Sequence, residues 1–179
     1  IVTDSINGMI PAQANLPALG LITIKASVRD EQNQVDTDFQ GTAHITLYDK
    51  AENLQTLSGK GNNPFTYTDY QNKLFSGKVD IIDGQLEFTF MVPKDINYST
   101  GPGRIIYYAS HEDGIRNAHG YNHDFSIGGN SGDVETSPEG PIMRLYINTP
   151  QFVSGQKVND SPVFYAHLYD PYGINTVGA

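Results

Sequence analysis

The 179-residue sequence contains no cysteine. Disulfide bonds, thiolate metal sites and a cysteine nucleophile are therefore excluded within these residues. A fold of this length can bury a substantial core, because 38% of the residues are hydrophobic. We therefore expect packing, without covalent cross-links, to stabilise it.

Long apolar runs and clusters of positive charge are also missing. No run approaches the roughly 18 residues of a membrane span, and the opening residues, IVTDSINGM, lack the basic and apolar regions of a signal peptide. The formal net charge is -9, and the eleven lysine and arginine residues are scattered. This pattern argues against nucleic acid and other anionic partners. Because the sequence starts without Met and stops just after a turn, we expect both ends to continue in a longer protein.

Alternating apolar and polar residues predict β-strands. One strand is expected at residues 21–29, where Ile22 and Ile24 alternate with Thr23 and Lys25, and another at residues 43–48. Between residues 73 and 110, a strand, a tight hairpin at Asp83-Gly84, a second strand ending before Pro93 and a third strand from Arg104 follow one another. A further strand is expected at residues 121–127.

The remaining segments define the predicted domain limits. Residues 49–72 read as a long exposed loop with at most one short strand, and residues 129–141 as a linker. We expect an immunoglobulin-like β-sandwich over residues 1–128, with a small barrel as the alternative. Residues 142–179 contain two strands, 142–148 and 163–170, which we interpret as the opening of a second, truncated sandwich. Such a tail is expected to dock on the first domain or to self-associate.

The only dense polar cluster is HEDGIRNAHGYNHD at residues 111–124. The spacing of His119 and His123 would suit zinc on a helix, but Gly120 and the neighbouring strands disfavour a helix. We therefore expect a polar loop whose imidazole and carboxylate groups bond to the backbone, without a metal. Asp36-Thr37-Asp38 could offer oxygens to calcium, but a solvated turn is the preferred interpretation.

Two further patterns are candidate sites. The segment GNSGD at residues 129–133 resembles a serine-protease loop, but a linker offers no scaffold for a base and oxyanion donors. Tyr67, Tyr70, Tyr107 and Tyr108 could form a sugar-stacking surface, although Tyr107 and Tyr108 must face opposite sides of their strand. We therefore assign no catalytic, cofactor-binding or metal-binding residue.

Several strings of residues resemble one protein family over nearly the whole chain. They are TDSINGM (3–9), DFQGT (38–42), MVPKDINY (91–98), GRIIYYA (103–109), AHGY (118–121), DFSIGG (124–129), PIMRLYINTPQFVSG (141–155) and DPYGINTVG (170–178). They are similar to the region that follows the peptidase domain in the PorU-like sortases of the Bacteroidetes type IX secretion system. These proteins resemble gingipains, with a Cys-His peptidase domain followed by β-sandwich modules.

The resemblance implies a function for the parent protein rather than for these residues. PorU-like sortases act at the outer-membrane surface, remove C-terminal sorting domains from secreted cargo and help to join the cargo to anionic lipopolysaccharide. The catalytic dyad has no counterpart here, since there is no cysteine and no histidine in a matching motif. We therefore expect a non-catalytic, surface-located module that braces the peptidase domain or contacts secretion partners, without a cofactor. The alternative is an independent adhesin or carbohydrate-binding sandwich, supported by fold class and exposed tyrosines.

Overall fold

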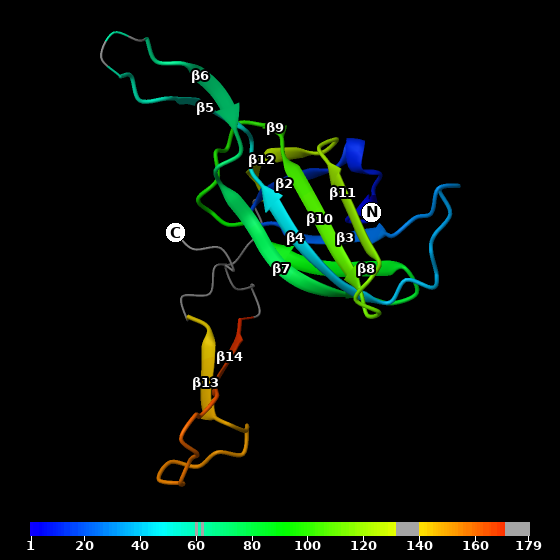
Figure 1. The fold of residues 1–179 in the computed structure, drawn as a ribbon. Coiled ribbons are helices and arrows are strands. Elements are labelled where there is room, and N and C mark those ends of the chain that lie inside the picture. The colour runs from blue at the N-terminus through cyan, green and yellow to red at the C-terminus, as the bar shows by residue number, and fades with distance from the viewer. Residues whose placement is uncertain (60, 62, 132–139, 171–179) are drawn as a thin grey trace. The chain divides into compact units, whose positions relative to one another are not determined.

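The computed structural model describes residues 1–131, except 60 and 62, and residues 140–170. The described residues belong to two compact units, one up to residue 131 and one from residue 140 (Figure 1). The first unit contains one short 3-10 helix, η1 (Pro11–Gln13), and twelve strands: β1 (Val2–Ile6), β2 (Asn15–Ala18), β3 (Leu21–Ser27), β4 (Gly41–Tyr48), β5 (Glu52–Gln55), β6 (Thr66–Asp69), β7 (Lys73–Ile81), β8 (Gln85–Met91), β9 (Gly101–Pro102), β10 (Arg104–His111), β11 (Asn117–Asn122) and β12 (Ser126–Asn130).

Two antiparallel sheets form the body of the first unit. One has the order β1-β3-β8 and the other the order β11-β10-β4-β7. A third small sheet, β2-β12-β9, adds the parallel pairing of β12 with β2. The predicted all-β class and the β-sandwich are thus confirmed.

The core lies between the inward faces of the two larger sheets. Alternate residues of β3, β4, β8 and β10 are buried: Ile22, Ile24, Ala26, Ala43, Ile45, Leu47, Leu86, Phe88, Phe90, Ile105, Tyr107 and Ala109. Phe75 of β7 packs between two rings of the opposite sheet, with ring centroids 4.9 Å from Phe88 and 5.1 Å from Phe90. Burial of alternate side chains is what the two-residue period of the sequence predicts.

The predicted tight turn at Asp83-Gly84 is present, but it does not close a paired hairpin. Both residues have positive φ, 50° and 72°, and the backbones of Ile82 and Gln85 exchange two hydrogen bonds, as in a two-residue turn. Beyond the turn, β7 pairs with β4 whereas β8 pairs with β3. The two strands separate because their apolar side chains meet across the core instead of side by side. A side chain on Gly84 would also collide with the carbonyl oxygen of Asp36, 2.2 Å from an ideal Cβ.

Other elements also differ from the sequence predictions. Residues 49–72 contain two strands, β5 and β6, rather than at most one. β1 and β2 were not predicted, because neither has a strong alternating pattern. The strand expected at residues 121–127 is broken into β11 and β12, where the side chain of Asn122 accepts the N–H of Asp124 at 2.8 Å and Phe125 turns into the core.

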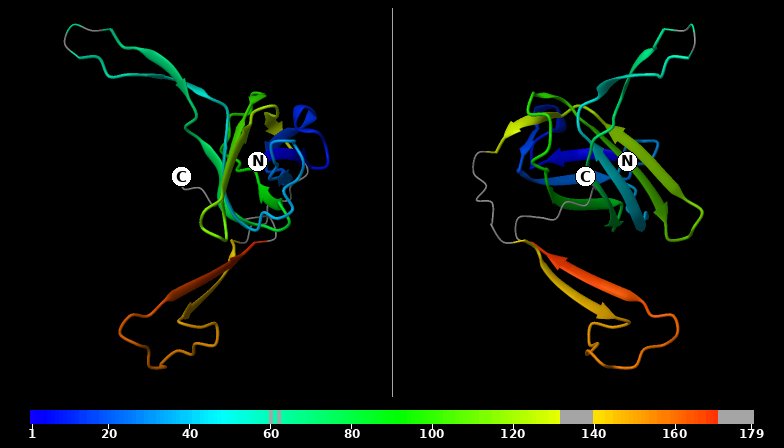
Figure 2. Two further views of the ribbon diagram at one scale, coloured as in Figure 1. Left: turned by 45° about the vertical axis from the view of Figure 1, so that its right-hand side comes forward. Right: turned by 90° about the vertical axis from the view of Figure 1, so that its left-hand side faces the viewer.

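Strands β5 and β6 form a two-stranded extension, here called the arm (residues 52–69). Figure 2 shows β5 and β6 extending away from the body of the sandwich. Most of the described side chains of the arm are exposed, and they include the apolar residues Leu57, Phe65 and Tyr67. An isolated two-stranded hairpin is only marginally stable in water. The arm therefore depends on its attachment to the sandwich.

The second unit consists of β13 (Ile142–Ile147) and β14 (Phe164–Tyr169), an antiparallel pair at the positions predicted. Its apolar side chains are largely exposed on both faces, including Met143, Leu145, Phe164 and Leu168. Of the predicted linker, Gly129 and Asn130 belong to β12, and residues 132–139 lie outside the described residues. The predicted domain limits and self-association of the tail stay predictions. Within the described ranges, no helix is long and apolar enough to cross a membrane.

Candidate functional site

The predicted polar cluster at residues 111–124 is divided between two strands and the turn that joins them. His111 ends β10, Asp113 lies in the turn, and His119 lies on β11 opposite Tyr108. His119 therefore lies on a strand and His123 just after its end, so the two are not on one helical turn. No group of three potential metal-ligating side chains gathers in the part of the chain that the structure describes.

Asp113 organises the turn between β10 and β11. Its Oδ1 accepts the backbone N–H groups of Ile115 at 2.8 Å and Arg116 at 3.0 Å, while Oδ2 lies 3.0 Å from Nε of Arg116. These hydrogen bonds stabilise the charged carboxylate. The N–H of Arg116 first, and then that of Ile115, hold the pKa of Asp113 well below its usual range.

His111 connects this turn to the loop before β4. Its ring meets Phe39 edge-on at 5.1 Å between centroids. Its Nδ1 accepts the backbone N–H of Asp113 at 2.9 Å, while its Nε2 lies 3.2 Å from the carbonyl oxygen of Asp38 and 2.6 Å from the guanidinium of Arg116. The imidazole of His111 and the carboxylate of Asp113 thus both bond to backbone groups, as the sequence predicted for this polar cluster.

Of the possible calcium ligands, the carboxylate of Asp36 is engaged with the protein. Asp36 Oδ1 accepts the N–H of Asp38 at 3.2 Å, and Asp36 Oδ2 lies 3.9 Å from Arg116. The backbone N–H of Phe39 also donates to the carbonyl oxygen of Asp36 at 3.0 Å, so residues 36–39 form a turn, as the preferred interpretation of the sequence had it.

The pKa of Asp113 gives a direct test of this turn. Because the folded-state pKa is lowered, the carboxylate stabilises the fold above the unfolded-state pKa of about 3.9, and this contribution is lost as pH falls through the lower folded-state value. We expect an NMR titration of the Asp113 carboxyl carbon to have its midpoint clearly below that of an unfolded aspartate. Arg116→Gln should leave most of the shift, since the backbone N–H groups are retained. A midpoint at the ordinary value would contradict the hydrogen bonding.

A buried charge lies where the arm joins the sandwich. Asp49, which is 3% exposed, follows β4 and accepts from Nζ of Lys50 at 2.6 Å. Its second oxygen receives the side-chain amide of Asn72 at 3.4 Å and the backbone N–H of Asn97 at 3.3 Å. Lys50 also donates to the carbonyl oxygen of Ile127 at 3.3 Å. This Asp49 anchor holds together segments that are far apart in sequence, so we assign it a structural role.

The four candidate tyrosines do not form one surface. Tyr107 is in the core, where its hydroxyl bonds to Thr3 at 2.8 Å and burial raises its pKa. Tyr67 lies on the arm, and Tyr108 is exposed on the outward face of β10. The prediction that Tyr107 and Tyr108 face opposite sides is confirmed.

Tyr70 instead belongs to a group here called the Arg104 cluster, which consists of Tyr48, Tyr70, Arg104, Tyr121 and His123. The guanidinium carbon of Arg104 lies 5.3 Å from the ring centre of Tyr70 and 5.6 Å from that of Tyr121. Tyr48 lies 6.2 Å from Tyr70, and His123 stacks on Tyr121 at 5.7 Å. Sequence reasoning missed this cluster. The available signal was that Arg104, Ile106 and Tyr108 alternate with buried residues on β10.

The serine-protease-like segment has no catalytic arrangement within the described residues. Gly129 and Asn130 are part of β12, while residues 132 and 133 lie outside that part of the chain. The hydroxyl of Ser131 is buried and has no hydrogen-bond partner there. No described base therefore contacts this hydroxyl to activate it.

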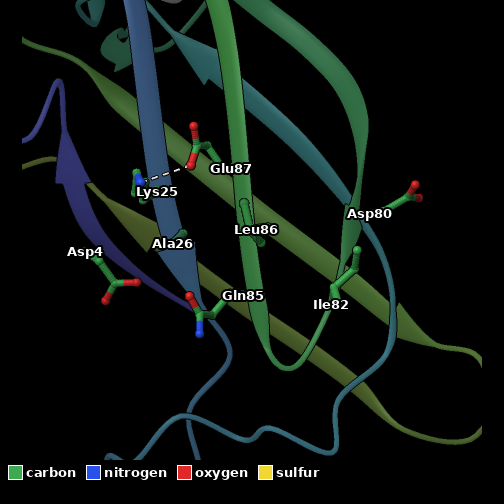
Figure 3. Close-up of a pocket in the computed structure, with 8 residues that line it drawn as sticks. All are labelled: Asp4, Lys25, Ala26, Asp80, Ile82, Gln85, Leu86 and Glu87. Atoms are coloured by element: carbon green, nitrogen blue, oxygen red, sulfur yellow. Dashed lines mark ion pairs between the residues drawn. The ribbon is translucent and has the colours of Figure 1, made fainter.

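One open depression of about 480 Å³ lies beside β3 and β8 (Figure 3). It is lined by Asp4, Lys25, Ala26, Asp80, Ile82, Gln85, Leu86 and Glu87. Lys25 pairs with Glu87 at 3.0 Å, and Asp4 pairs with Arg29 at 2.7 Å. Because its polar lining side chains are exposed and several are paired, it is a weaker candidate than the Arg104 cluster.

Comparison with known proteins relates the chain to a solved structure. No protein-family model matches the chain, and no curated protein matches it. Among solved structures, the crystal structure of dimeric latent PorU from Porphyromonas gingivalis is similar, with a TM-score of 0.71 and 30% sequence identity. The similarity covers 99% of this chain and 17% of the PorU chain, so the chain spans only a small part of that protein's length. The resemblance predicted from the sequence strings is thereby confirmed.

Proposed function

We propose that this PorU-like region is a non-catalytic module of a cell-surface, outer-membrane-associated sortase that removes C-terminal sorting domains from type IX secretion cargo. The observation that carries the proposal is the similarity to PorU over nearly the whole chain at 30% identity. The lack of cysteine supports the non-catalytic role, since a gingipain-type reaction requires a thiolate nucleophile.

Within such a sortase, the module braces the peptidase domain or contacts secretion partners. The arm supports a contact role because it presents apolar side chains to solvent, with Phe65 68% exposed and Leu57 100% exposed. Exposed apolar side chains that gather on one projecting element favour an interaction site more than single ones scattered over a surface do. The Asp49 anchor fixes the base of the arm, which reduces the ordering cost of binding.

The first test separates catalysis from binding. We expect the 179-residue chain to leave a purified cargo protein with a C-terminal sorting domain intact. Mixed with the separately expressed peptidase domain of the same PorU-like protein, it should form an equimolar complex by size-exclusion chromatography and calorimetry. Cleavage of the cargo by the chain alone would contradict the non-catalytic assignment.

The second test identifies the contact surface. Phe65→Ser on the arm is expected to weaken the complex about tenfold, because it removes an exposed apolar contact. Ile115→Ser is the matched control, since Ile115 is also exposed but lies in the turn between β10 and β11. Binding to a secretion-system component but not to the peptidase domain would favour contact with secretion partners over bracing of the peptidase domain. Failure to bind either protein would overturn both proposed roles.

A further inference from the structure

We propose that one face of the arm docks on a protein surface that presents an apolar patch bordered by an arginine or a lysine. This face, here called the contact face, consists of Glu52, Leu54, Phe65, Tyr67 and Asp69. The proposal rests on the contact role proposed above for the arm, and it adds the chemistry of the partner that the arm recognises.

The register of the arm places these five side chains together. Leu54 of β5 is opposite Tyr67 of β6, and Glu52 is opposite Asp69, two residues further along each strand. The pairing continues at Phe65, whose carbonyl oxygen accepts the N–H of the residue after β5 at 2.9 Å. Because side chains two residues apart share a face of a strand, the apolar residues and both carboxylates lie on the same face of the arm.

The opposite face of the arm bonds within itself. The hydroxyl of Thr68 donates to Oδ1 of Asn53 at 3.1 Å, and Nε2 of Gln55 donates to the hydroxyl of Thr66 at 3.4 Å. These polar pairs cross the two strands, whereas the rings of the contact face stand in solvent on an element that extends away from the body of the sandwich (Figure 2). A partner that buries apolar surface therefore gains more from the contact face.

The two carboxylates of the contact face repel each other. Like charges directly opposite in an antiparallel pair are destabilising. Asp69 accepts the N–H of Tyr70 at 2.8 Å and the side-chain amide of Gln71 at 3.0 Å, and both donors are neutral. The side chain of Glu52 has no hydrogen-bond or ion-pair partner among the described residues. The free arm thus carries an unfavourable interaction that a cation between the carboxylates would remove.

The basic residues near the base of the arm do not supply that cation. Lys50 is held in the Asp49 anchor, Arg104 lies 5.3 Å from the ring centre of Tyr70, and Lys73 is exposed at the start of β7. Within the described ranges, no basic side chain forms an ion pair with either carboxylate, and Lys60, between β5 and β6, lies outside them. A basic side chain of a partner is therefore the complement that this face lacks.

The carboxylate pair also disfavours two other occupants. Two copies of the chain that met through their contact faces would bring all their carboxylates together, and like charges across an interface are costly. A lipid surface would have to desolvate the carboxylates or, if it is anionic, would repel them. A protein surface with a basic border to its apolar patch meets neither cost.

NMR titrations of the whole chain with two model peptides test the partner chemistry. Both peptides are amphipathic helices with leucine on one face, and the border of that face carries lysine in one peptide and glutamate in the other. We expect saturable binding of the lysine peptide, with amide shifts centred on Leu54 and Tyr67, at least about tenfold tighter than binding of the glutamate peptide. Added salt should reduce this preference, because it screens exposed charges.

Charge variants separate the contact face from the overall acidity of the chain. Glu52→Lys should abolish the preference for the lysine peptide. It should not unfold the arm, because an opposite charge then faces Asp69 across the strands. Glu31→Lys, the same substitution at an exposed residue outside the arm, is the matched control and should keep the preference. Cross-strand NMR contacts between Leu54 and Tyr67 establish that the arm is folded in both variants.

Several outcomes of these titrations would overturn the proposal. They are no saturable binding of the lysine peptide up to about 1 mM, equal binding of the two peptides, shifts centred outside the arm, or the same preference in both variants. Dimerisation of the chain, or its binding to phosphatidylcholine vesicles, would equally contradict the choice of occupant if Phe65→Ser abolished it.

The protein complexes tested above distinguish this inference from the contact role itself. With whichever protein binds the chain, Glu52→Lys should weaken the complex about tenfold, whereas Glu31→Lys should not. A complex that both variants form equally well would overturn the partner chemistry and leave the contact role intact. If neither protein binds, the contact role fails, and the peptide titrations alone decide the chemistry of the contact face.

Discussion

Asp49→Ala is expected to lower the free energy of unfolding of the first unit by about 3 kcal/mol. The variant removes both carboxylate oxygens of the Asp49 anchor. It leaves the largely buried ammonium group of Lys50 without its partner, and it also leaves the N–H of Asn97 without an acceptor. Losing one member of a buried ion pair costs more than losing both, because the remaining charge stays away from water.

Urea denaturation followed by far-UV circular dichroism would measure this loss. The double variant Asp49→Ala/Lys50→Met should recover part of the stability, since it removes the unpaired charge while keeping the long side chain. Asp95→Ala is the control, as Asp95 is exposed, and it should change stability by less than about 0.5 kcal/mol. If Asp49→Ala and Asp95→Ala unfold at the same urea concentration, the anchor does not stabilise the unit.

The Asp49 anchor also shows what the sequence could not predict. The alternation of Ala43, Ile45 and Leu47 predicted the strand that precedes Asp49, because burial of alternate side chains in a strand follows a local two-residue period. The carboxylate itself looks like an ordinary polar residue at a strand end. Its partners Asn72 and Asn97 are 23 and 48 residues away, so only the tertiary fold makes it a buried, fully bonded group.

The Arg104 cluster was missed for a similar reason. Local alternation places Arg104 on the outward face of β10, and this much is readable from the sequence. Its ring partners come from the segment before β7 and from β11, and nothing local pairs them. Conversely, the polar network at residues 111–116 was predicted well, because Asp113 bonds to backbone groups only two and three residues away.

The separation of β7 and β8 shows which features the local sequence determines and which depend on the packing of the whole fold. The turn at Asp83-Gly84 was predictable because two consecutive positive φ angles favour an Asp-Gly pair. Whether the flanking strands then pair with each other depends on the faces they bury. Here, Phe75 on β7 stacks on Phe88 of β8 across the interior, and this requires the two strands to lie in opposite sheets.

Phe88→Ala is therefore expected to lower the free energy of unfolding by about 4 kcal/mol, more than Asp49→Ala does. Phe88 is 7% exposed and contacts both Phe75 and Phe90, with ring centroids at 4.9 Å and 6.1 Å. Truncation removes the buried ring and leaves a cavity between the sheets that the remaining rings cannot fill without moving the strands. Phe88→Leu retains much of the volume and should cost less than about 2 kcal/mol.

The arm supplies a matched control for the same chemical change. Phe65→Ala removes an identical ring from an exposed position, so it should alter the free energy of unfolding by less than about 0.5 kcal/mol. Urea unfolding monitored by tyrosine fluorescence and circular dichroism would compare the three variants. If Phe88 packs between the sheets, Phe88→Ala should be the most destabilised variant, Phe88→Leu the next and Phe65→Ala the least. Equal losses for the two alanine variants would mean that Phe88 does not occupy the space between the sheets.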